Sequence, residues 1–165
     1  MAVWVMKLNP EGGENPFEFC LRQKIVGFGW GVEGEPKTPQ ELKELYEAQK
    51  PCFNERGFIT AINAFVRMKK DDIIWTVDKY GTYYLCQTNG EFHCDYTGEY
   101  IKSHIVHYMA CPVFYKIGTG ELVPNAIIHS LGVCGTIQAV ENEEAIKLSH
   151  HFLVYIKELE KEKEA

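Results

Sequence analysis

The chain has 165 residues, which is the length of one globular domain or of two small ones. Apolar residues make up 45% and aromatic residues 13%, a composition that supports a packed core and argues against disorder. With 17 basic and 23 acidic side chains the formal net charge is −6, which excludes a histone-like protein that coats phosphates through bulk positive charge. No segment has the pattern of a membrane span or of a secretion signal, so we expect a cytoplasmic protein.

The cysteines do not form a metal-binding pattern. Six of them are scattered along the chain, and no two are spaced as C-x-x-C. Structural zinc sites take their ligands from such short paired spacings. We therefore predict no metal and no cofactor, and we expect these thiols to be reduced and mostly buried.

The first half of the chain alternates strands and helices. Asn15-Pro16 is typical of a helix start, and Thr38-Pro39-Gln40-Glu41 fits a capping box. Glycines at positions 27, 29 and 31 punctuate the second apolar run, which indicates close approach of another group to its backbone. The expected elements are a strand at Val3–Leu8, a helix at Pro16–Lys24, a strand at Ile25–Trp30 and helices at Thr38–Gln49 and Phe58–Met68.

The second half consists mainly of short strands. Ile73–Asp78 and Thr82–Gln87 flank a turn and predict a hairpin, and a turn at Asn89-Gly90 extends it into a meander with Glu91–Tyr96. Further strands are expected at Ile105–Ala110, Pro112–Ile117 and Gly135–Val140, a short helix or turn at Asn125–Leu131, and a final helix capped by Asn142. This order predicts an α+β protein with a curved or barrel-like sheet.

One domain is expected over residues 1–156. The charged tail 157–165 alternates Glu and Lys, which is typical of a solvated helix end and also of a linker helix that leads to a further domain.

The sequence contains none of the common catalytic motifs. There is no phosphate-binding P-loop, no G-x-S-x-G nucleophile turn and no H-E-x-x-H pair. We therefore predict a non-enzymatic protein, although catalytic triads also assemble from distant positions.

Several aromatic residues stand where core packing is not the only explanation. Trp30 lies between glycines, Trp75 follows a charged turn, and the adjacent Tyr83 and Tyr84 must point to opposite faces of a strand. Two or three aromatic faces recognise a flat base or a methylated amine well. The alternative for each ring is an ordinary place in the core.

The chain resembles a known superfamily in three segments. Val3–Pro10 is similar to the opening strand of EVE domains and, more loosely, of YTH domains, both of the PUA-like superfamily. Arg56–Trp75 resembles the EVE helix that ends in a "met-lys-x-gly-asp" turn, with Asp71 in place of the usual glycine. Gly135–Val140 and the helix after it resemble the closing elements. A chain of this size that ends in a charged helix also resembles the N-terminal specificity domain of McrB-type restriction systems.

The resemblance implies a reader of a modified, in the first place methylated, base that is flipped out of the helix into an aromatic cage. DNA rather than RNA is the expected partner, together with a fused or separate NTPase or nuclease, and no membrane contact is expected. The implied cage residues are Trp30, Gly31, Trp75, Tyr83 and Tyr84; the implied base-edge or first-strand contacts are Lys7, Leu8, Asn9 and Asp78; the implied phosphate contacts are Arg56, Arg67, Lys69 and Lys70.

Two alternatives to a DNA reader stay open. A YTH-type reader of modified RNA would contact the 2′-hydroxyl group. A regulatory domain that binds a nucleotide or another small molecule suits the acidic net charge. For either nucleic acid, the charge of −6 predicts weak nonspecific attraction to phosphates, so that affinity depends on the base itself.

Overall fold

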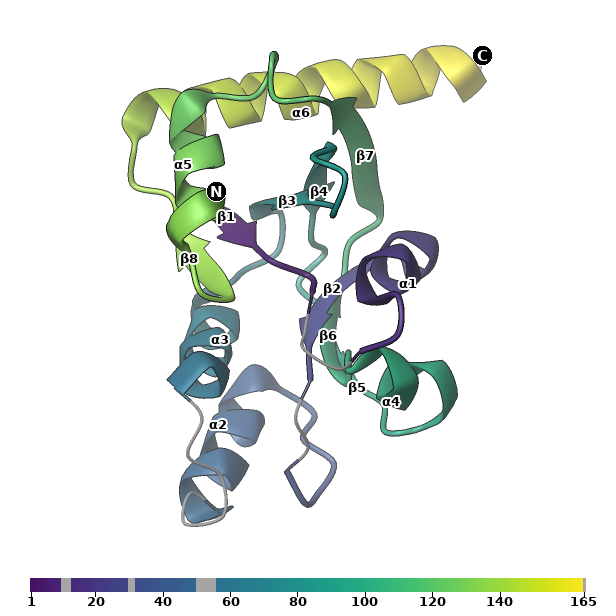
Figure 1. Ribbon diagram of the computed structural model, residues 1–165, viewed down its shortest axis with the longest axis vertical. Helices are drawn as coiled ribbons and strands as arrows, with labels where there is room; N and C mark the ends of the chain where they lie inside the picture. Colours follow the sequence, from purple (N-terminus) through teal and green to yellow (C-terminus); the bar gives the residue numbers. More distant parts are fainter. Residues whose placement is uncertain (10–12, 30–31, 50–55, 165) are drawn as a thin grey trace.

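The computed structural model describes residues 1–9, 13–29, 32–49 and 56–164, and its architecture confirms the α+β class (Figure 1). The strands are β1 (Val3–Met6), β2 (Ile25–Phe28), β3 (Ile73–Val77), β4 (Tyr83–Gln87), β5 (Phe92–Cys94), β6 (His107–Ala110), β7 (Val113–Gly118) and β8 (Ile137–Ala139). The helices are α1 (Pro16–Gln23), α2 (Pro39–Gln49), α3 (Arg56–Arg67), α4 (Gly98–Ser103), α5 (Asn125–Val133) and α6 (Glu143–Glu164).

The strands form two sheets in place of the single one expected, and neither closes into a barrel. The first sheet has five strands in the order β7-β4-β3-β1-β8, and the second has three in the order β2-β6-β5. Strand β1 runs parallel to β3, and the other pairs are antiparallel. All four residues of β1 are buried, as expected for a strand that is covered on both faces.

The expected meander is wrong beyond the β3–β4 hairpin. Strand β4 pairs with β7, whereas β5 leaves the first sheet and pairs with β6 in the second. The turn at Gly90 (φ 80°) is tied to the second sheet, because Thr88 Oγ1 donates to the Ala110 carbonyl and also accepts from the Gly90 N–H. Pro112 stands between β6 and β7, where the chain passes from one sheet to the other.

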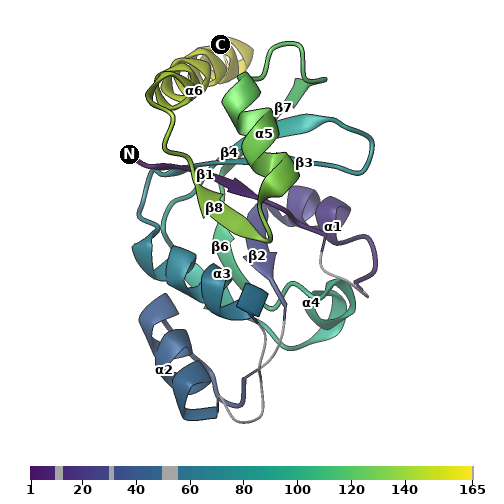
Figure 2. The same ribbon diagram turned by 60° about the vertical axis from the view of Figure 1, so that its left-hand side comes forward.

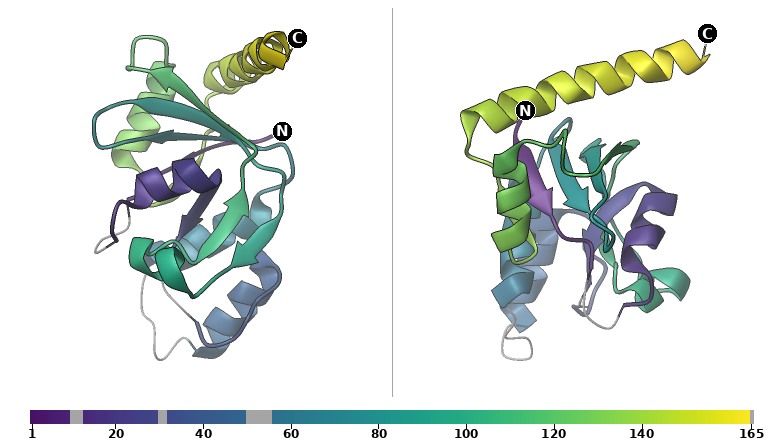
Figure 3. Two further views of the ribbon diagram at one scale, coloured as in Figure 1. Left: turned by 90° about the vertical axis from the view of Figure 1, so that its right-hand side faces the viewer. Right: turned by 45° about the horizontal axis from the view of Figure 1, so that its top comes forward.

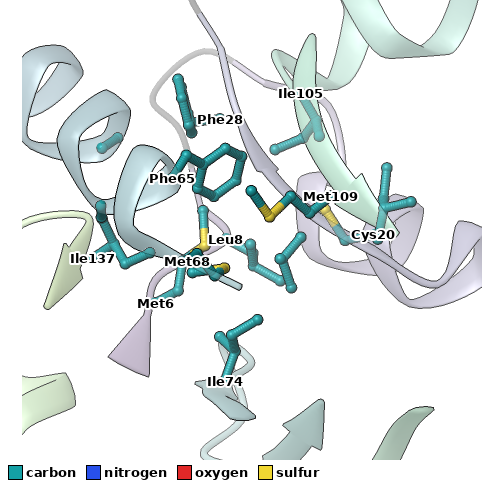
Figure 4. Close-up of a cluster of buried hydrophobic side chains, with 14 of the residues drawn as sticks. Met6, Leu8, Cys20, Phe28, Phe65, Met68, Ile74, Ile105, Met109 and Ile137 are labelled. Atoms are coloured by element: carbon teal, nitrogen blue, oxygen red, sulfur yellow. The ribbon is translucent and has the colours of Figure 1, made fainter. Parts of the chain in front are cut away.

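The five-stranded sheet separates two hydrophobic cores. Alternate residues point to opposite faces, so Trp4 and Ile74 join the first core whereas Val5 and Trp75 join the second. The first core also takes side chains from α1, α3 and the three-stranded sheet, and Figure 4 shows Phe28, Phe65 and Met109 packed in it. Helices α5 and α6 supply the second core on the other side of the sheet (Figure 2).

A buried carboxylate fixes the start of the five-stranded sheet. Asp72 is 3% exposed, and its Oδ1 accepts the backbone N–H of Ala2. Its Oδ2 accepts the Trp4 indole N–H at 3.1 Å and the Lys69 backbone N–H at 3.0 Å. The preceding Asp71 has φ 75°, a left-handed conformation that glycine adopts without strain. The position where the resembled motif carries glycine is therefore one whose backbone favours glycine.

The last helix is one continuous element from Glu143 to Glu164, so residues 157–164 of the charged tail form its final turns. The Asn142 side chain accepts the Ala145 N–H at 2.8 Å, which confirms the predicted cap. Figure 3 shows α6 lying along the edge of the molecule. Among the described residues, no helix combines the length and the apolar character that a bilayer span needs. Helix α4 was not predicted, because it has only six residues and no periodic pattern.

Candidate functional site

A cavity of about 380 Å³ lies between the end of β1, the start of α1 and the β3–β4 hairpin. We call it the α1–hairpin cavity. Its walls combine aromatic rings, amides and charged groups. The lining residues are Asn9, Gly13, Asn15, Pro16, Phe17, Glu18, Leu21, Asp78, Lys79, Tyr80 and Tyr84.

The start of α1 leaves an amide side chain uncommitted to the helix. Pro16 occupies the first helical turn, as predicted, and Asn15 precedes it with φ 45° in the left-handed region. In this conformation the Asn15 side chain makes no capping hydrogen bond, which corrects the expected cap. Its amide instead lies in the wall of the cavity, where it can donate and accept hydrogen bonds.

The hairpin fixes a carboxylate at the opposite wall. Asp78 Oδ1 accepts the backbone N–H groups of Tyr80 and Thr82, both at 2.9 Å, and the tight turn closes at Gly81 (φ 80°). Asp78 Oδ2 accepts no hydrogen bond from the residues that the structure describes. The turn also presents the Tyr80 ring outward, 76% exposed, with the Lys79 ammonium 5.2 Å from its centroid.

Three rings form the floor of the cavity and the core beneath it. The Phe17 and Tyr84 centroids are 5.0 Å apart, and Phe114 lies 6.1 Å from Phe17 and 5.8 Å from Tyr84. Burial raises the pKa of the Tyr84 phenol, and the nearby Asp78 carboxylate raises it further. Tyr84 is therefore a neutral hydroxyl at physiological pH, held by ring packing.

Three of the residues singled out from the sequence meet in this cavity: Asn9, Asp78 and Tyr84. Sequence reasoning missed the contributions of Phe17, Asn15 and Tyr80. A signal for Tyr80 was present, because an aromatic residue in a tight turn cannot be a core residue of either flanking strand. No sequence signal indicated that the start of α1 faces the hairpin.

Other predicted contacts do not reach the cavity. Trp75 is fully buried in the second core, where its indole N–H donates to Ser149 Oγ at 2.9 Å and its ring meets Phe152 edge to face. Tyr83 packs against the same core, on the face opposite to Tyr84. Leu8 is fully buried in the first core. Burial corrects the assignment of Trp75 and Leu8 to a ligand contact, whereas Tyr83 is partly buried and lies on the face of β4 away from the cavity.

Lys7, which follows strand β1, does not line the α1–hairpin cavity. Its backbone N–H donates to the Thr136 carbonyl. Burial raises the pKa of the Cys134 thiol, and the Lys7 ammonium partly opposes that shift, so Lys7 lies near the second core. Trp30 and Gly31, the first residues of the expected cage, lie outside the described residues.

The predicted phosphate contacts do not gather at the cavity either. Arg56 opens α3 and Arg67 ends it, while Lys69 and Lys70 are exposed in the turn that follows. The Arg67 guanidinium lies 5.3 Å from the Trp4 ring centroid, in a groove of about 390 Å³ between α3 and β8. The Trp4 ring, which Asp72 holds, thus positions the arginine at the sheet edge.

The α1–hairpin cavity can bind a small planar group that carries hydrogen-bond donors. Its rings offer stacking surface, and Asp78, Asn9 and Asn15 offer acceptors for N–H groups. Its two carboxylates, Glu18 and Asp78, face a single ammonium group, so a bare phosphate is disfavoured there. The described residues contain no group of three histidine, cysteine or carboxylate side chains placed to hold a metal ion.

Comparisons of the chain with protein-family models, with curated proteins and with solved structures find no match.

Proposed function

We propose that this chain is a non-enzymatic domain that binds DNA carrying a modified, in the first place methylated, base, and that it targets a restriction or defence system to such DNA. The observation that carries the proposal is the α1–hairpin cavity, where Phe17, Tyr80 and Tyr84 stand among amide and carboxylate groups. This composition suits a flipped-out base. The sequence resemblance to EVE and YTH domains of the PUA-like superfamily supports the same function.

The energetics of base flipping set a requirement for such a site. Taking a base out of the stack costs a few kcal/mol, and each good aromatic contact returns about 1–3 kcal/mol. One ring alone does not offset the cost. The exposed Tyr80 ring and the buried Tyr84 ring together supply more than one stacking surface.

The distribution of charge supports recognition through the base. The chain carries a net charge of −6, and the cavity itself holds more acidic than basic groups. Phosphate contacts would come from Arg67, Lys69 and Lys70, near the start of β1 and the edge of the sheet, together with Arg56 at the other end of α3. The proposal therefore expects weak binding to unmodified DNA and a small salt dependence.

The test is a binding titration by fluorescence anisotropy. Labelled duplexes with a single methylated adenine, a single methylated cytosine or no modification are compared, and the same sequences are used as single-stranded DNA and as RNA. The proposal expects one modified DNA to bind at least about tenfold more tightly than its unmodified counterpart, so that contacts with the added group contribute about 1.4 kcal/mol to the binding free energy. Equal affinity for all duplexes contradicts it.

Two variants locate the binding. Tyr80→Ala removes an exposed ring, and Asp78→Asn keeps the Oδ1 acceptor of the hairpin but removes the charge. Both are expected to weaken binding of the modified duplex, as is Trp30→Ala. Tyr155→Ala on α6 is the matched control, because Tyr155 is also exposed (59%) and lies outside the cavity.

The alternatives are outcomes of the same titration. Preference for modified single-stranded RNA over DNA identifies an RNA reader, since the 2′-hydroxyl distinguishes the two. Binding of free nucleotides with no gain from an oligonucleotide identifies a small-molecule regulatory domain.

A further inference from the structure

A second cavity lies at the edge of the second sheet, between strand β5 and the segment 35–37. Its volume is about 410 Å³. We call it the β5 groove. One wall carries Glu35 and Lys37; the other carries Phe92, Asp95, Tyr96 and Tyr108. The walls are joined at Cys94, whose thiol donates to the Pro36 carbonyl at 3.6 Å.

The aromatic rings of the groove are held in place by other rings. Tyr108 stacks on Tyr100 with centroids 5.1 Å apart and an interplanar angle of 18°, and His93 flanks it at 5.6 Å. The Tyr96 ring meets the buried His107 edge to face at 5.6 Å. Because their packing fixes these rings, they form a preorganised surface that loses little entropy when a ligand binds.

Carboxylate charge dominates the inside of the groove. Burial raises the pKa of the Cys94 thiol, and Glu35 and Asp95 both raise it further, whereas Lys37 alone opposes them among the charged groups. Glu35 also acts on Tyr96, and Asp95 acts on Tyr108, in the same direction. The two carboxylates, on opposite walls of the groove, thus both affect the Cys94 thiol. Asp95 Oδ1 accepts from Thr97, and its Oδ2 accepts from no described residue.

We propose that the β5 groove binds an alkylammonium group, which lies against the Tyr96 and Tyr108 rings that line the groove and is neutralised by Glu35 and Asp95. Ring faces and carboxylates together attract an organic cation, whereas the same carboxylates repel a phosphate or another anion. The group belongs either to a free polyamine or to a lysine side chain, methylated or not. This second site does not depend on the modified-base function, because it shares no lining residue with the α1–hairpin cavity.

The test is a titration followed by two-dimensional ¹H–¹⁵N NMR on the full chain. The probes are N-acetyl-lysine methylamide with a free, a trimethylated or an acetylated ε-nitrogen, and spermidine. We expect the cationic probes to shift the amide signals around Cys94 and Tyr108 in a saturable manner, and the neutral acetylated probe to cause no shift there. Tighter binding of spermidine than of either lysine cation indicates a polyamine source, and the reverse order indicates a lysine side chain.

Charge-removing variants complete the test. Glu35→Gln and Asp95→Asn are each expected to weaken binding by about two- to fivefold, as for a partly exposed charge pair, and together by more. Asp95→Asn keeps the oxygen that Thr97 uses. Glu33→Gln removes the same charge from an exposed residue in the same segment and should leave affinity unchanged. No shift with any cation, equal shifts with the acetylated probe, or unchanged affinity in the double variant overturns the proposal.

Discussion

The two faces of the five-stranded sheet differ in how completely other elements cover them. On the second-core face, α5 and α6 cover the strands, and Trp75 is sealed beneath α6 with its indole N–H bonded to Ser149. On the first-core face, the packing around Tyr84 and Phe17 opens at the β3–β4 hairpin into the α1–hairpin cavity. Trp75 and Tyr84 lie on the paired strands β3 and β4 but belong to different cores, and they therefore have different roles. An aromatic residue on a strand supports a binding site only where its side chain points to a face of the sheet that opens into a cavity.

The largest expected effect is on the sealed face. Trp75→Ala should lower the free energy of unfolding by about 3–5 kcal/mol, because it leaves a cavity in the second core and removes the link to α6. Chemical denaturation measures the change. If the two faces are independent, the folded variant still binds ligand with unchanged affinity. A loss of affinity in the folded fraction would show that the sealed face also shapes the site.

The next effect concerns the carboxylate beneath Trp4. Asp72→Asn should lower the free energy of unfolding by about 2–4 kcal/mol. The two carboxylate oxygens of Asp72 together accept three hydrogen bonds, and the substitution replaces one of these oxygens with an N–H donor. Asp71→Asn is the matched control and should be nearly neutral, since asparagine tolerates the left-handed backbone. Urea titrations of both variants check this. Equal costs would contradict a specific role for Asp72.

Alkaline pH should destabilise the first-core face more than the second. Burial raises the pKa values of the Cys20, Cys86 and Cys111 thiols, so each stays protonated when folded at a pH where the unfolded chain loses the proton. Their contribution to stability is complete below about pH 9 and falls above it, by up to about 1.4 kcal/mol per pH unit for each thiol.

Denaturation between pH 8 and pH 10.5 tests this difference between the cores. Cys20→Ala should flatten the alkaline loss of stability. Cys134→Ala should do so less, because Lys7 lowers the pKa of that second-core thiol and so reduces its shift. Equal flattening by both variants would contradict the assignment of the effect to the first core.

The smallest stability effect is a gain. Asp71→Gly should stabilise the fold by about 0.5–1 kcal/mol, because glycine adopts φ 75° at a lower energetic cost than aspartate does. Lys70→Gly, one residue earlier, is the control and should not stabilise. The comparison of their melting temperatures decides whether the backbone at Asp71, rather than flexibility of the turn, is responsible.

Local signals predicted most of the elements but not their assembly. Pro16, Asn142 and the helical spacing after Phe58 marked helices that the structure contains. The Asn89-Gly90 turn was correctly predicted, yet nothing local to it indicates that β5 joins β6 in a second sheet, since Thr88 and Ala110 make that link from 22 residues apart. The alternation of Tyr83 and Tyr84 followed from strand geometry, whereas which face stays open depends on where α1 and α6 pack.

The most direct measurement is the affinity of the chain and of Tyr80→Ala for a methylated duplex and its unmodified counterpart. We predict at least about tenfold tighter binding of one methylated duplex, and loss of most of that preference in Tyr80→Ala with the fold intact. Equal affinity for both duplexes, unchanged by the substitution, would contradict it.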